Sequence, residues 1–376
     1  MTKKTAVITI NASWNIVNFR RSLVAALVQR GYRVVALAPQ DAYSSHIAGL
    51  GAEYIPIEID KQGQSIFRDA LLLWRYFRSL KQLKPHILLA YTAKPNVYGS
   101  IAARWLGIPV INNVSGLGTA FIKHGTLTHI VSRLYKLAFR ESKTVFFQNP
   151  EDRDLFLQMR LVRGYQARLL PGSGIDLMKF APVPRPDDVE RPMTFLLVAR
   201  LLWDKGVGEF VEAARLVGRE APETRFQLLG FVDVPNRTAV SRHDVQAWVD
   251  EGVVEYLGEA EDVRPHIAAA DCIVLPSYRE GLPRTLLEGA AMGKPLIATD
   301  VPGCRHVVQD GINGFTCVVR DPRSLANAML RLLRLPPVER QKMGVAARSK
   351  VEAEFDDKIA IARYLEAIDQ ALTGGL

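Results

Sequence analysis

Two glutamates and a glycine lie around a predicted turn in the second half of the chain. Glu280 and Gly281 come just before a predicted helix at residues 284–292, and Glu288 lies inside that helix. The N–H groups and the positive dipole end of a helix N-terminus can bind a phosphate, and glycine lets the backbone approach such a ligand closely. These residues therefore predict an anion-binding site.

The two glutamates are not spaced like the acid and base of a glycosidase. Eight residues of helix between Glu280 and Glu288 would span roughly 12 Å, more than the about 5 to 9.5 Å that such pairs need. We expect the two carboxylates to hold two ends of one ligand. Considered alone, the same residues could instead form a solvated helix face with Glu280 as a capping acid.

A second polar cluster, Arg200, Lys205 and Gly206, follows the predicted strand at residues 194–199. Guanidinium and ammonium groups at the carboxyl end of a strand could clamp a diphosphate and neutralise the charge on a departing nucleotide. The alternative interpretation is that Lys205 and Gly206 are ordinary residues of a loop.

Strands and helices alternate through the sequence and must position these residues. Short apolar runs, typical of buried strands, are separated by segments with helical periodicity. The predicted strands are residues 5–10, 34–38, 54–57, 87–91, 110–113, 145–147, 194–199, 225–229, 253–256, 272–275 and 295–298. Such alternation predicts doubly wound parallel sheets, whose ligands bind at the carboxyl ends of the strands.

The chain length of 376 residues favours two domains rather than one. A stretch with four prolines at residues 181–192 is the expected linker. We therefore expect one domain at residues 1–180 and a second at residues 193–355. A C-terminal helix at residues 356–376 can return to the first domain.

The positive charge is concentrated in the first half of the chain. Residues 1–180 hold 24 Lys and Arg against 10 Asp and Glu, whereas residues 181–376 hold 24 against 29. An anionic lipid surface or a phosphate-bearing acceptor fits this half, and the lack of any nucleic-acid-binding motif argues against DNA or RNA.

The three cysteines lack metal-site or disulfide spacing, and no apolar run approaches 18 residues, so we expect a cytoplasmic protein.

Together, the two polar clusters and the two-sheet layout resemble the GT-B glycosyltransferases, and within them glycosyltransferase family 4. The resemblance covers nearly the whole chain and is closest to bacterial transferases, of the N-acetylgalactosaminyl type, that extend undecaprenyl-diphosphate-linked sugars. It is carried by Ala199-Arg200-Leu201-Leu202-Trp203-Asp204-Lys205-Gly206-Val207, Leu275-Pro276-Ser277-Tyr278-Arg279-Glu280-Gly281 and Gly116-Leu117-Gly118. It implies an α/β GT-B fold of two doubly wound, Rossmann-like domains facing a central cleft.

The resemblance also implies roles for residues of the second half. Arg200 and Lys205 would bind the diphosphate of a UDP-sugar donor, Glu280 its sugar and Glu288 its ribose, so Glu280, Arg200 and Lys205 are the expected catalytic residues. The backbone groups expected to line the sugar and the phosphate are those of Gly281, Leu282 and Pro283. The implied reaction retains the anomeric configuration and uses no metal, no cofactor and no protein nucleophile, because the leaving phosphate helps to deprotonate the acceptor.

The acceptor side is less fully specified. Lys94 and Asn96 match a Lys-x-Asn of the lipid-linked subgroup and are candidates for binding the acceptor diphosphate, although Asn96 could simply cap a helix. Ser115 and Gly116 are the other expected substrate contacts, where many family members carry a sugar-contacting histidine; His124 is nearby. The loop after the first strand also lacks the glycines of many members.

Two segments predict contact with a membrane. Residues 65–84 and 121–143 mix large apolar side chains with Lys and Arg, and basic amphipathic helices can lie on anionic leaflets. A helix packed on its sheet with a solvated basic face would show the same pattern. We expect peripheral binding to the inner face of the cell membrane, because a lipid-linked acceptor would require it.

Two other motifs are not expected to bind ligands. Asp152-Arg153-Asp154 matches the D-x-D that other glycosyltransferases use for a metal, but it is predicted to open a helix, where acids favour the dipole. Gly116-Leu117-Gly118 lacks a third glycine and follows a late strand, which argues against a nicotinamide site.

The expected function is transfer of a hexose or N-acetylhexosamine from a UDP-sugar to a lipid-linked, undecaprenyl-diphosphate acceptor during assembly of a cell-surface glycan. Two alternatives fit the same residues: a UDP-sugar 2-epimerase on the same architecture, and a non-catalytic protein that binds nucleotide sugars. The donor sugar and the acceptor depend on the detailed shape of the site, which sequence patterns do not define.

Overall fold

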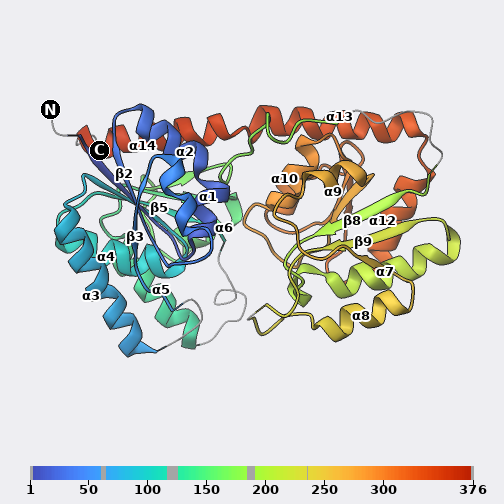
Figure 1. Ribbon diagram of the computed structural model, residues 1–376, viewed down its shortest axis with the longest axis horizontal. Helices are drawn as coiled ribbons and strands as arrows, with labels where there is room; N and C mark the ends of the chain where they lie inside the picture. The colour runs from blue at the N-terminus through green and yellow to red at the C-terminus, as the bar shows by residue number, and fades with distance from the viewer. Residues whose placement is uncertain (1–2, 61–64, 117–125, 184–190, 235, 374–376) are drawn as a thin grey trace. The chain divides into compact units, whose positions relative to one another are not determined.

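The computed structural model describes residues 3–60, 65–116, 126–183, 191–234 and 236–373, which form two compact units (Figure 1). The first unit holds the described residues up to Ser173 and those from Asp357 onward, and the second holds those of Gly174–Asp356. The division falls ahead of the linker predicted at residues 181–192, because Ile175 and Phe180 are buried in the core of the second unit. Residues 184–190 of that linker lie outside the described residues.

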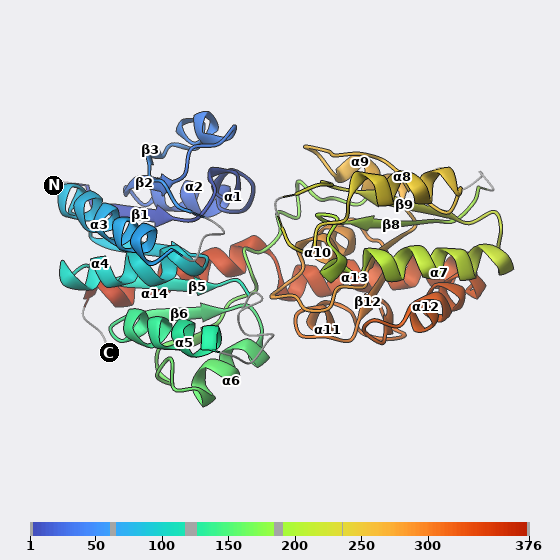
Figure 2. The ribbon, with the colours of Figure 1, turned by 90° about the horizontal axis from the view of Figure 1, so that it is seen from below.

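The described part of the first unit contains a seven-stranded parallel sheet. Its order is β3-β2-β1-β4-β5-β6-β7, and Figure 2 shows labelled strands of this unit side by side. The strands are β1 (Thr5–Thr9), β2 (Arg33–Ala38), β3 (Glu53–Pro56), β4 (Ile87–Tyr91), β5 (Val110–Val114), β6 (Thr144–Phe147) and β7 (Ala167–Leu169). The helices are α1 (Ser13–Phe19), α2 (Arg21–Gln29), α3 (Ile66–Leu83), α4 (Ser100–Trp105), α5 (Thr126–Phe139), α6 (Pro150–Gln158) and α14 (Asp357–Thr373).

Successive side chains of each strand point to opposite faces of this sheet, and helices cover both faces. Ala6 and Ile8 of β1 pack with α1, α2 and α14, whereas Val7 packs with α3 and α4. Burial on both faces explains why these strands are continuous apolar runs rather than alternating ones.

The C-terminal helix α14 packs on the first unit, although the whole second unit lies between them in the sequence. The amide of Asn113, in β5, donates a hydrogen bond to the Tyr364 hydroxyl at 2.9 Å, and the Ser22 hydroxyl donates to the Asp357 carboxylate at 2.6 Å. In Figure 1 the red helix α14 accordingly lies among the blue and green elements of this unit.

Replacing Tyr364 by phenylalanine is expected to lower the free energy of unfolding by about 1–3 kcal/mol, because the buried amide of Asn113 loses its acceptor. Urea denaturation followed by circular dichroism measures the change. Tyr165→Phe is the control, since Tyr165 is 61% exposed and a surface hydrogen bond contributes less than about 0.5 kcal/mol. Equal effects of the two substitutions would show that the buried hydrogen bond does not hold α14.

The described part of the second unit contains a six-stranded parallel sheet of order β10-β9-β8-β11-β12-β13. The strands are β8 (Thr194–Val198), β9 (Arg225–Leu229), β10 (Glu255–Tyr256), β11 (Cys272–Leu275), β12 (Leu296–Thr299) and β13 (Gly314–Cys317). The helices are α7 (Val207–Glu220), α8 (Arg242–Asp250), α9 (Arg264–Ala269), α10 (Arg284–Ala291), α11 (Cys304–Val307), α12 (Pro322–Arg334) and α13 (Pro337–Glu354). Phe195 and Leu197 of β8 pack with α7 and α12, and Leu196 and Val198 pack with α10.

The doubly wound α/β fold predicted for both halves is confirmed. Each predicted strand is present close to its predicted bounds, and the structure adds β7 and β13, which the sequence patterns did not predict. Across the described ranges, no helix has both the length and the hydropathy that a membrane span requires.

Candidate functional site

The sheet of the second unit reverses its direction of winding between β8 and β11. From β8 the chain adds β9 and β10 on one side, and then crosses to the other side of β8 for β11, β12 and β13. Ligands of such sheets bind outside the carboxyl ends of the strands at this switch point. Arg200 and Lys205 follow β8 and Glu280 follows β11, so both predicted polar clusters come after the two strands that flank this switch point.

Lys205 and Glu280 form an ion pair between Nζ and Oε1 across the switch point. Their side chains are only 21% and 13% exposed, so the pair is partly shielded from water. Charges in such surroundings interact more strongly with a ligand than fully solvated ones do. The Glu280 carboxylate therefore positions the Lys205 ammonium at the edge of the sheet where a ligand is expected.

The turns after β8 and β11 are bound directly to one another. The backbone oxygen of Asp204 accepts hydrogen bonds from the N–H of Tyr278 at 2.9 Å and from the hydroxyl of Ser277 at 3.2 Å. Gly206 has a φ of +74°, and a Cβ at this position would lie 2.1 Å from the Pro276 oxygen. Only glycine fits there, so the two turns keep a fixed register.

Arg200 extends from the end of β8 and is exposed. The residues on both sides of it are tied to the next strand, because the N–H groups of Ala199 and Leu201 donate to the backbone oxygens of Leu229 and Phe231. Within the part of the chain that the structure describes, no residue forms a hydrogen bond or an ion pair with its guanidinium. Its N–H donors are therefore available to a ligand.

The N-terminus of α10 lies at the same switch point. The residues that lead into this helix are Gly281, Leu282 and Pro283, with Pro283 as the N-cap. The Thr285 hydroxyl donates to the Val198 oxygen at 2.8 Å, which fixes the start of α10 beside the end of β8. Gly303 packs closely against the turn that leads into α10, because a Cβ at Gly303 would lie 2.6 Å from the backbone oxygen of Gly281. The backbone groups predicted to line the donor sugar and the phosphate are therefore fixed by contacts with both β8 and Gly303.

Glu288 is a buried carboxyl inside α10, 9% exposed. Arg284, one turn earlier, donates to its Oε1 at 2.8 Å and also donates to the backbone oxygen of Gly174 at 3.1 Å. Burial raises the pKa of Glu288, and the neighbouring Arg284 opposes that rise. The ion pair orients the carboxyl, and its contact with a ribose stays a prediction.

Three residues that had no predicted role also shape this edge. The Tyr278 hydroxyl donates to Glu209 of α7 at 2.7 Å, and the guanidinium carbon of Arg320 lies 4.4 Å from the centre of the Tyr278 ring. Burial, together with the hydrogen bond to Glu209, raises the pKa of Tyr278 to about 12, so the phenol stays protonated and donates. The run from Pro276 to Tyr278 after β11 could have indicated the tyrosine; no sequence signal indicates Arg320.

In the first unit the winding reverses between β1 and β4, and Lys94 follows β4. Its ammonium pairs with Asp69 of α3 at 2.6 Å, and each of the two side chains is 19% exposed. Asp69 also accepts a hydrogen bond from the Tyr98 hydroxyl at 2.8 Å. Lys94 is therefore fixed at the carboxyl edge of this sheet, where the acceptor diphosphate is predicted to bind.

Asn96, the other candidate for the acceptor diphosphate, is 1% exposed. Its amide nitrogen donates to the backbone oxygen of Asn113 at 2.8 Å, and its amide oxygen accepts from Asn112 at 3.0 Å. These bonds give Asn96 a structural role, and its contact with the acceptor stays a prediction. Asn96 is not a helix N-cap, because it lies inside the π-helical turn Pro95–Gly99, and the N-cap of that turn is Lys94.

Ser115 and Gly116 follow β5, next to β4 in the sheet. The Ser115 hydroxyl donates to Asn113 at 2.9 Å, and Gly116 is exposed with a φ of +145°. Their contact with the acceptor stays a prediction. His124 and the rest of the run that begins at Gly116 lie outside the described residues.

The D-x-D motif begins a helix, as predicted. Asp152 lies in the first turn of α6, where its N–H donates to the Asn149 side chain at 2.8 Å and its carboxylate accepts from the same amide at 3.2 Å. Asp152 is 1% exposed, and Asp154 pairs with Arg153 at 2.8 Å. Asp152 therefore stabilises the start of the helix.

Two family models match the chain. A "Glycosyl transferase 4-like domain" matches residues 16–172, and "Glycosyl transferases group 1" matches residues 192–335. The chain is 28% identical over 378 residues to the N,N'-diacetylbacillosaminyl-diphospho-undecaprenol alpha-1,3-N-acetylgalactosaminyltransferase of Campylobacter jejuni, covering 96% of this chain and 97% of that protein. It is 26% identical over 280 residues to the UDP-Gal:alpha-D-GlcNAc-diphosphoundecaprenol alpha-1,3-galactosyltransferase of Escherichia coli, covering 71% of each.

Comparison with solved structures also finds glycosyltransferase folds. Anabaena Alr3699/HepE, solved in complex with UDP and glucose, superposes with a TM-score of 0.80 at 18% identity, covering 97% of this chain and 99% of that one. At this identity the likeness concerns the fold, which agrees with both family models. The chain therefore belongs to the glycosyltransferases, with a glycosyl transferase 4-like domain followed by a group 1 domain in the GT-B fold.

Proposed function

We propose that this glycosyltransferase moves a hexose or N-acetylhexosamine from a UDP-sugar to an undecaprenyl-diphosphate-linked sugar, with retention of the anomeric configuration. The observation that carries the proposal is the convergence at the switch point of the second unit. The Lys205–Glu280 pair, the available guanidinium of Arg200 and the N-terminus of α10 meet there. Cationic donors and helix N–H groups are the chemistry that recognises a diphosphate.

In the proposed reaction the bond between the donor sugar C1 and the UDP oxygen breaks, and the acceptor hydroxyl oxygen bonds to C1 on the same face. The hydroxyl proton passes to the leaving phosphate oxygen. Arg200 and Lys205 would neutralise the charge that develops on that phosphate, so that no metal ion is needed. Glu280 would accept a hydrogen bond from the donor sugar once the diphosphate has taken the ammonium of Lys205.

The acceptor class rests on the relatives. Both transferases described above carry a diphosphoundecaprenol sugar in their names. Lys94 supports the proposal from within this chain, because it is a fixed cation at the carboxyl edge of the first unit's sheet. An ammonium there suits the diphosphate that joins the acceptor sugar to its lipid.

Binding of UDP tests the donor half of the proposal. Titration calorimetry in buffer with EDTA is expected to show saturable binding to the wild-type protein, weakened about tenfold or more by Arg200→Gln. Arg219→Gln removes a comparable exposed charge and is expected to have no effect. Equal affinity of the wild type and Arg200→Gln would contradict the role of Arg200.

Product analysis separates the proposal from its alternatives. Release of a free, epimerised sugar from the UDP-sugar without any acceptor would identify an epimerase. Saturable binding of nucleotide sugars without transfer across a panel of acceptors would identify a binding protein. We expect transfer that depends on a lipid-diphosphate acceptor.

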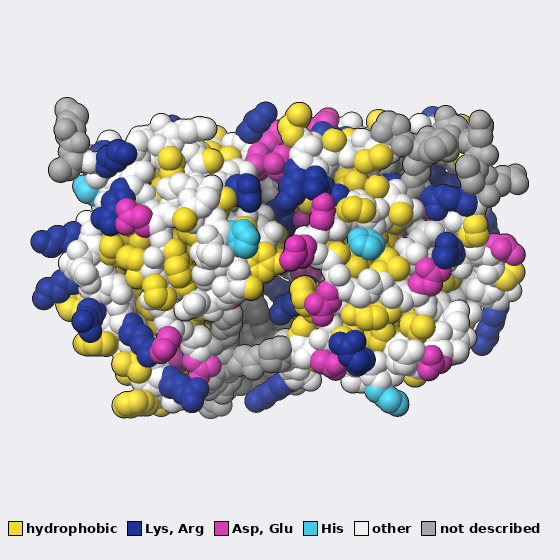
Figure 3. Space-filling model, in the orientation of Figure 1, with side chains coloured by type: hydrophobic (Ala, Val, Ile, Leu, Met, Phe, Trp, Pro, Cys, Tyr) yellow, Lys and Arg dark blue, Asp and Glu magenta, His cyan; other side chains and the backbone are white. Residues whose placement is uncertain are grey.

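Peripheral docking on the inner face of the cell membrane is part of the proposal, and α3 supports it. Leu72, Tyr76 and Leu80 of this helix are buried, whereas Phe67 and Trp74 are 79% and 53% exposed. Dark blue cationic and yellow apolar side chains both occur in the lower left of Figure 3, where α3 lies in Figure 1. Exposed aromatic groups beside Lys and Arg suit the interface of an anionic leaflet.

The double variant Phe67→Ser/Trp74→Ser is expected to bind vesicles that contain phosphatidylglycerol about tenfold or more weakly than the wild type, because two apolar side chains no longer insert. Vesicle co-sedimentation measures the binding. Ile312→Ser/Val345→Ser is the matched control, since these residues of the second unit are 57% and 61% exposed. Unchanged binding of the α3 variant would exclude this helix as the docking surface.

A further inference from the structure

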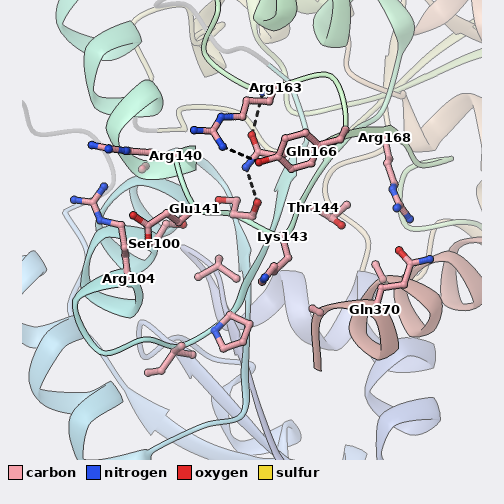
Figure 4. Close-up of a pocket in the computed structure, with 18 of the residues that line it drawn as sticks. Ser100, Arg104, Arg140, Glu141, Lys143, Thr144, Arg163, Gln166, Arg168 and Gln370 are labelled. Carbon is pink, nitrogen blue, oxygen red and sulfur yellow. Dashed lines mark hydrogen bonds between the residues drawn. The ribbon is translucent and has the colours of Figure 1, made fainter. Parts of the chain in front are cut away.

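A cavity of about 640 Å³ lies at the edge of the first unit's sheet where the strands begin (Figure 4). Val110 and Thr144, the first residues of β5 and β6, line it, and Gln370 of α14 lines another side. Lys94 and Ser115 follow the carboxyl ends of β4 and β5, which is the opposite edge of this parallel sheet. The cavity is therefore separate from the predicted acceptor site, and its volume is typical of small-molecule sites.

The cavity is strongly cationic. Among the described residues that line it, the only carboxylate is that of Glu141. The five cationic residues of the lining are Arg104, Arg140, Lys143, Arg163 and Arg168. Concentrating charges of one sign in a concave surface raises the local potential for a ligand of the opposite sign.

Two of the arginines are held in place by neutral groups. Arg104 donates to the backbone oxygen of Leu137 at 3.1 Å, and Arg163 donates to the Tyr165 hydroxyl at 2.8 Å. A carbonyl and a phenol orient a guanidinium without neutralising its charge. These two cations are therefore positioned but still able to attract an anion.

The other three cations have little or no counter-charge. The carboxylate of Glu366 lies 3.9 Å from Arg168, at the limit of an ion pair. For Arg140 and Lys143, the described ranges contain no side-chain hydrogen bond and no ion pair. Figure 4 shows Lys143 between Arg104 on one side and Arg168 and Gln370 on the other.

Stabilisation of helix ends explains only part of this cluster. Arg104 lies in the last turn of α4 and Arg140 directly follows α5, and cations at these positions favour the helix dipole. Lys143 precedes β6 and Arg168 lies within β7, so neither one caps a helix. Helix-end stabilisation therefore does not account for the whole cluster, and the exposed side chains of Arg140, Lys143 and Arg163 are open to an anionic ligand.

We propose that this cavity binds a phosphate-bearing anion, at a site that is separate from the proposed donor and acceptor sites. Phosphate oxygens can accept hydrogen bonds from several Arg and Lys side chains at once, which matches cations arranged around a hollow. The phosphate can belong to a soluble molecule or to the headgroup of an anionic phospholipid. Since Gln370 lines the cavity, the bound anion would also link α14 to the sheet.

Pyrophosphate and vesicles test the two sources of phosphate. Calorimetric titration with pyrophosphate is carried out on the full chain with saturating UDP, so that Arg200 and Lys205 are occupied. Co-sedimentation with phosphatidylglycerol vesicles, against phosphatidylcholine vesicles, forms the second arm. The variant Arg140→Gln/Lys143→Gln is compared with Arg219→Gln/Arg323→Gln, which removes two exposed charges from the second unit.

The cavity variant is expected to lose about tenfold or more in affinity, while the control variant and UDP binding are unchanged. If the cavity variant loses only pyrophosphate binding, the ligand is a soluble phosphate. If it loses only vesicle binding, the ligand is a phospholipid headgroup. If it loses both, the cavity recognises the phosphate group that the two ligands share. If the cavity variant and the wild type behave alike in both arms, the cavity does not bind phosphate.

Discussion

Replacing Lys205 by methionine is expected to lower kcat for sugar transfer by about a hundredfold to a thousandfold, the usual effect of removing one charge-stabilising donor. The ammonium is held by Glu280 at the switch point, partly shielded from water, where charge would develop on the leaving diphosphate. Methionine keeps much of the volume of lysine and removes its charge. Steady-state kinetics with a radiolabelled UDP-sugar measure the change.

The Lys205→Met variant also leaves the Glu280 carboxylate without its cation, which lowers stability. The double variant Lys205→Met/Glu280→Gln removes both charges, so we expect a wild-type circular dichroism spectrum with kcat still low. Lys342→Met is the control, because Lys342 pairs with Glu339 on an exposed helix surface. Recovery of transfer in the double variant would show that the ammonium is not part of the catalytic machinery.

Replacing Gly206 by alanine is expected to lower the free energy of unfolding by about 3 kcal/mol or more. The left-handed backbone at Gly206 disfavours a side chain, and the added Cβ would lie 2.1 Å from the oxygen of Pro276. Either the two turns move apart or the backbone strain remains. Because Lys205 precedes this glycine, we also expect weaker binding of UDP.

Gly218→Ala is the matched control for Gly206→Ala. Gly218 lies inside α7, and a Cβ there would meet nothing within 4 Å. Alanine is favoured over glycine in a helix by about 1 kcal/mol, so this variant should be slightly more stable than the wild type. Urea denaturation measures both variants. A Gly206→Ala variant as stable as Gly218→Ala would show that the turns after β8 and β11 are not tightly packed.

Buried strands could be predicted well because each is a short, continuous apolar run. The runs at β1, β4, β8 and β11 are covered by helices on both faces, so their apolar pattern follows directly from burial. Strand β7 was missed because it has three half-buried residues and includes Arg168. Strand β13 was missed because it begins with Gly314. Glycine is required at this position, since an added Cβ would lie 1.9 Å from the backbone oxygen of Leu296.

The meeting of Lys205 and Glu280 could be predicted, because residues after strands of a doubly wound sheet meet at one edge. The position of Arg320 beside Tyr278 could not, since it depends on how a distant loop packs. The burial of Asn96 was also missed, because a Lys-x-Asn pattern does not show whether the amide faces a ligand or bonds to β5. Tertiary contacts, rather than the local sequence pattern, set the direction of such side chains.

The most direct test of the proposed function is transfer from labelled UDP-sugars to an undecaprenyl-diphosphate-linked acceptor in buffer with EDTA, with the product's anomeric configuration determined by NMR. We expect a product only when the acceptor is present, with the donor's configuration retained and with little product from Lys205→Met. A product of inverted configuration would contradict the retaining mechanism. Failure of every UDP-sugar to transfer across a panel of lipid-diphosphate acceptors would contradict the proposed function itself.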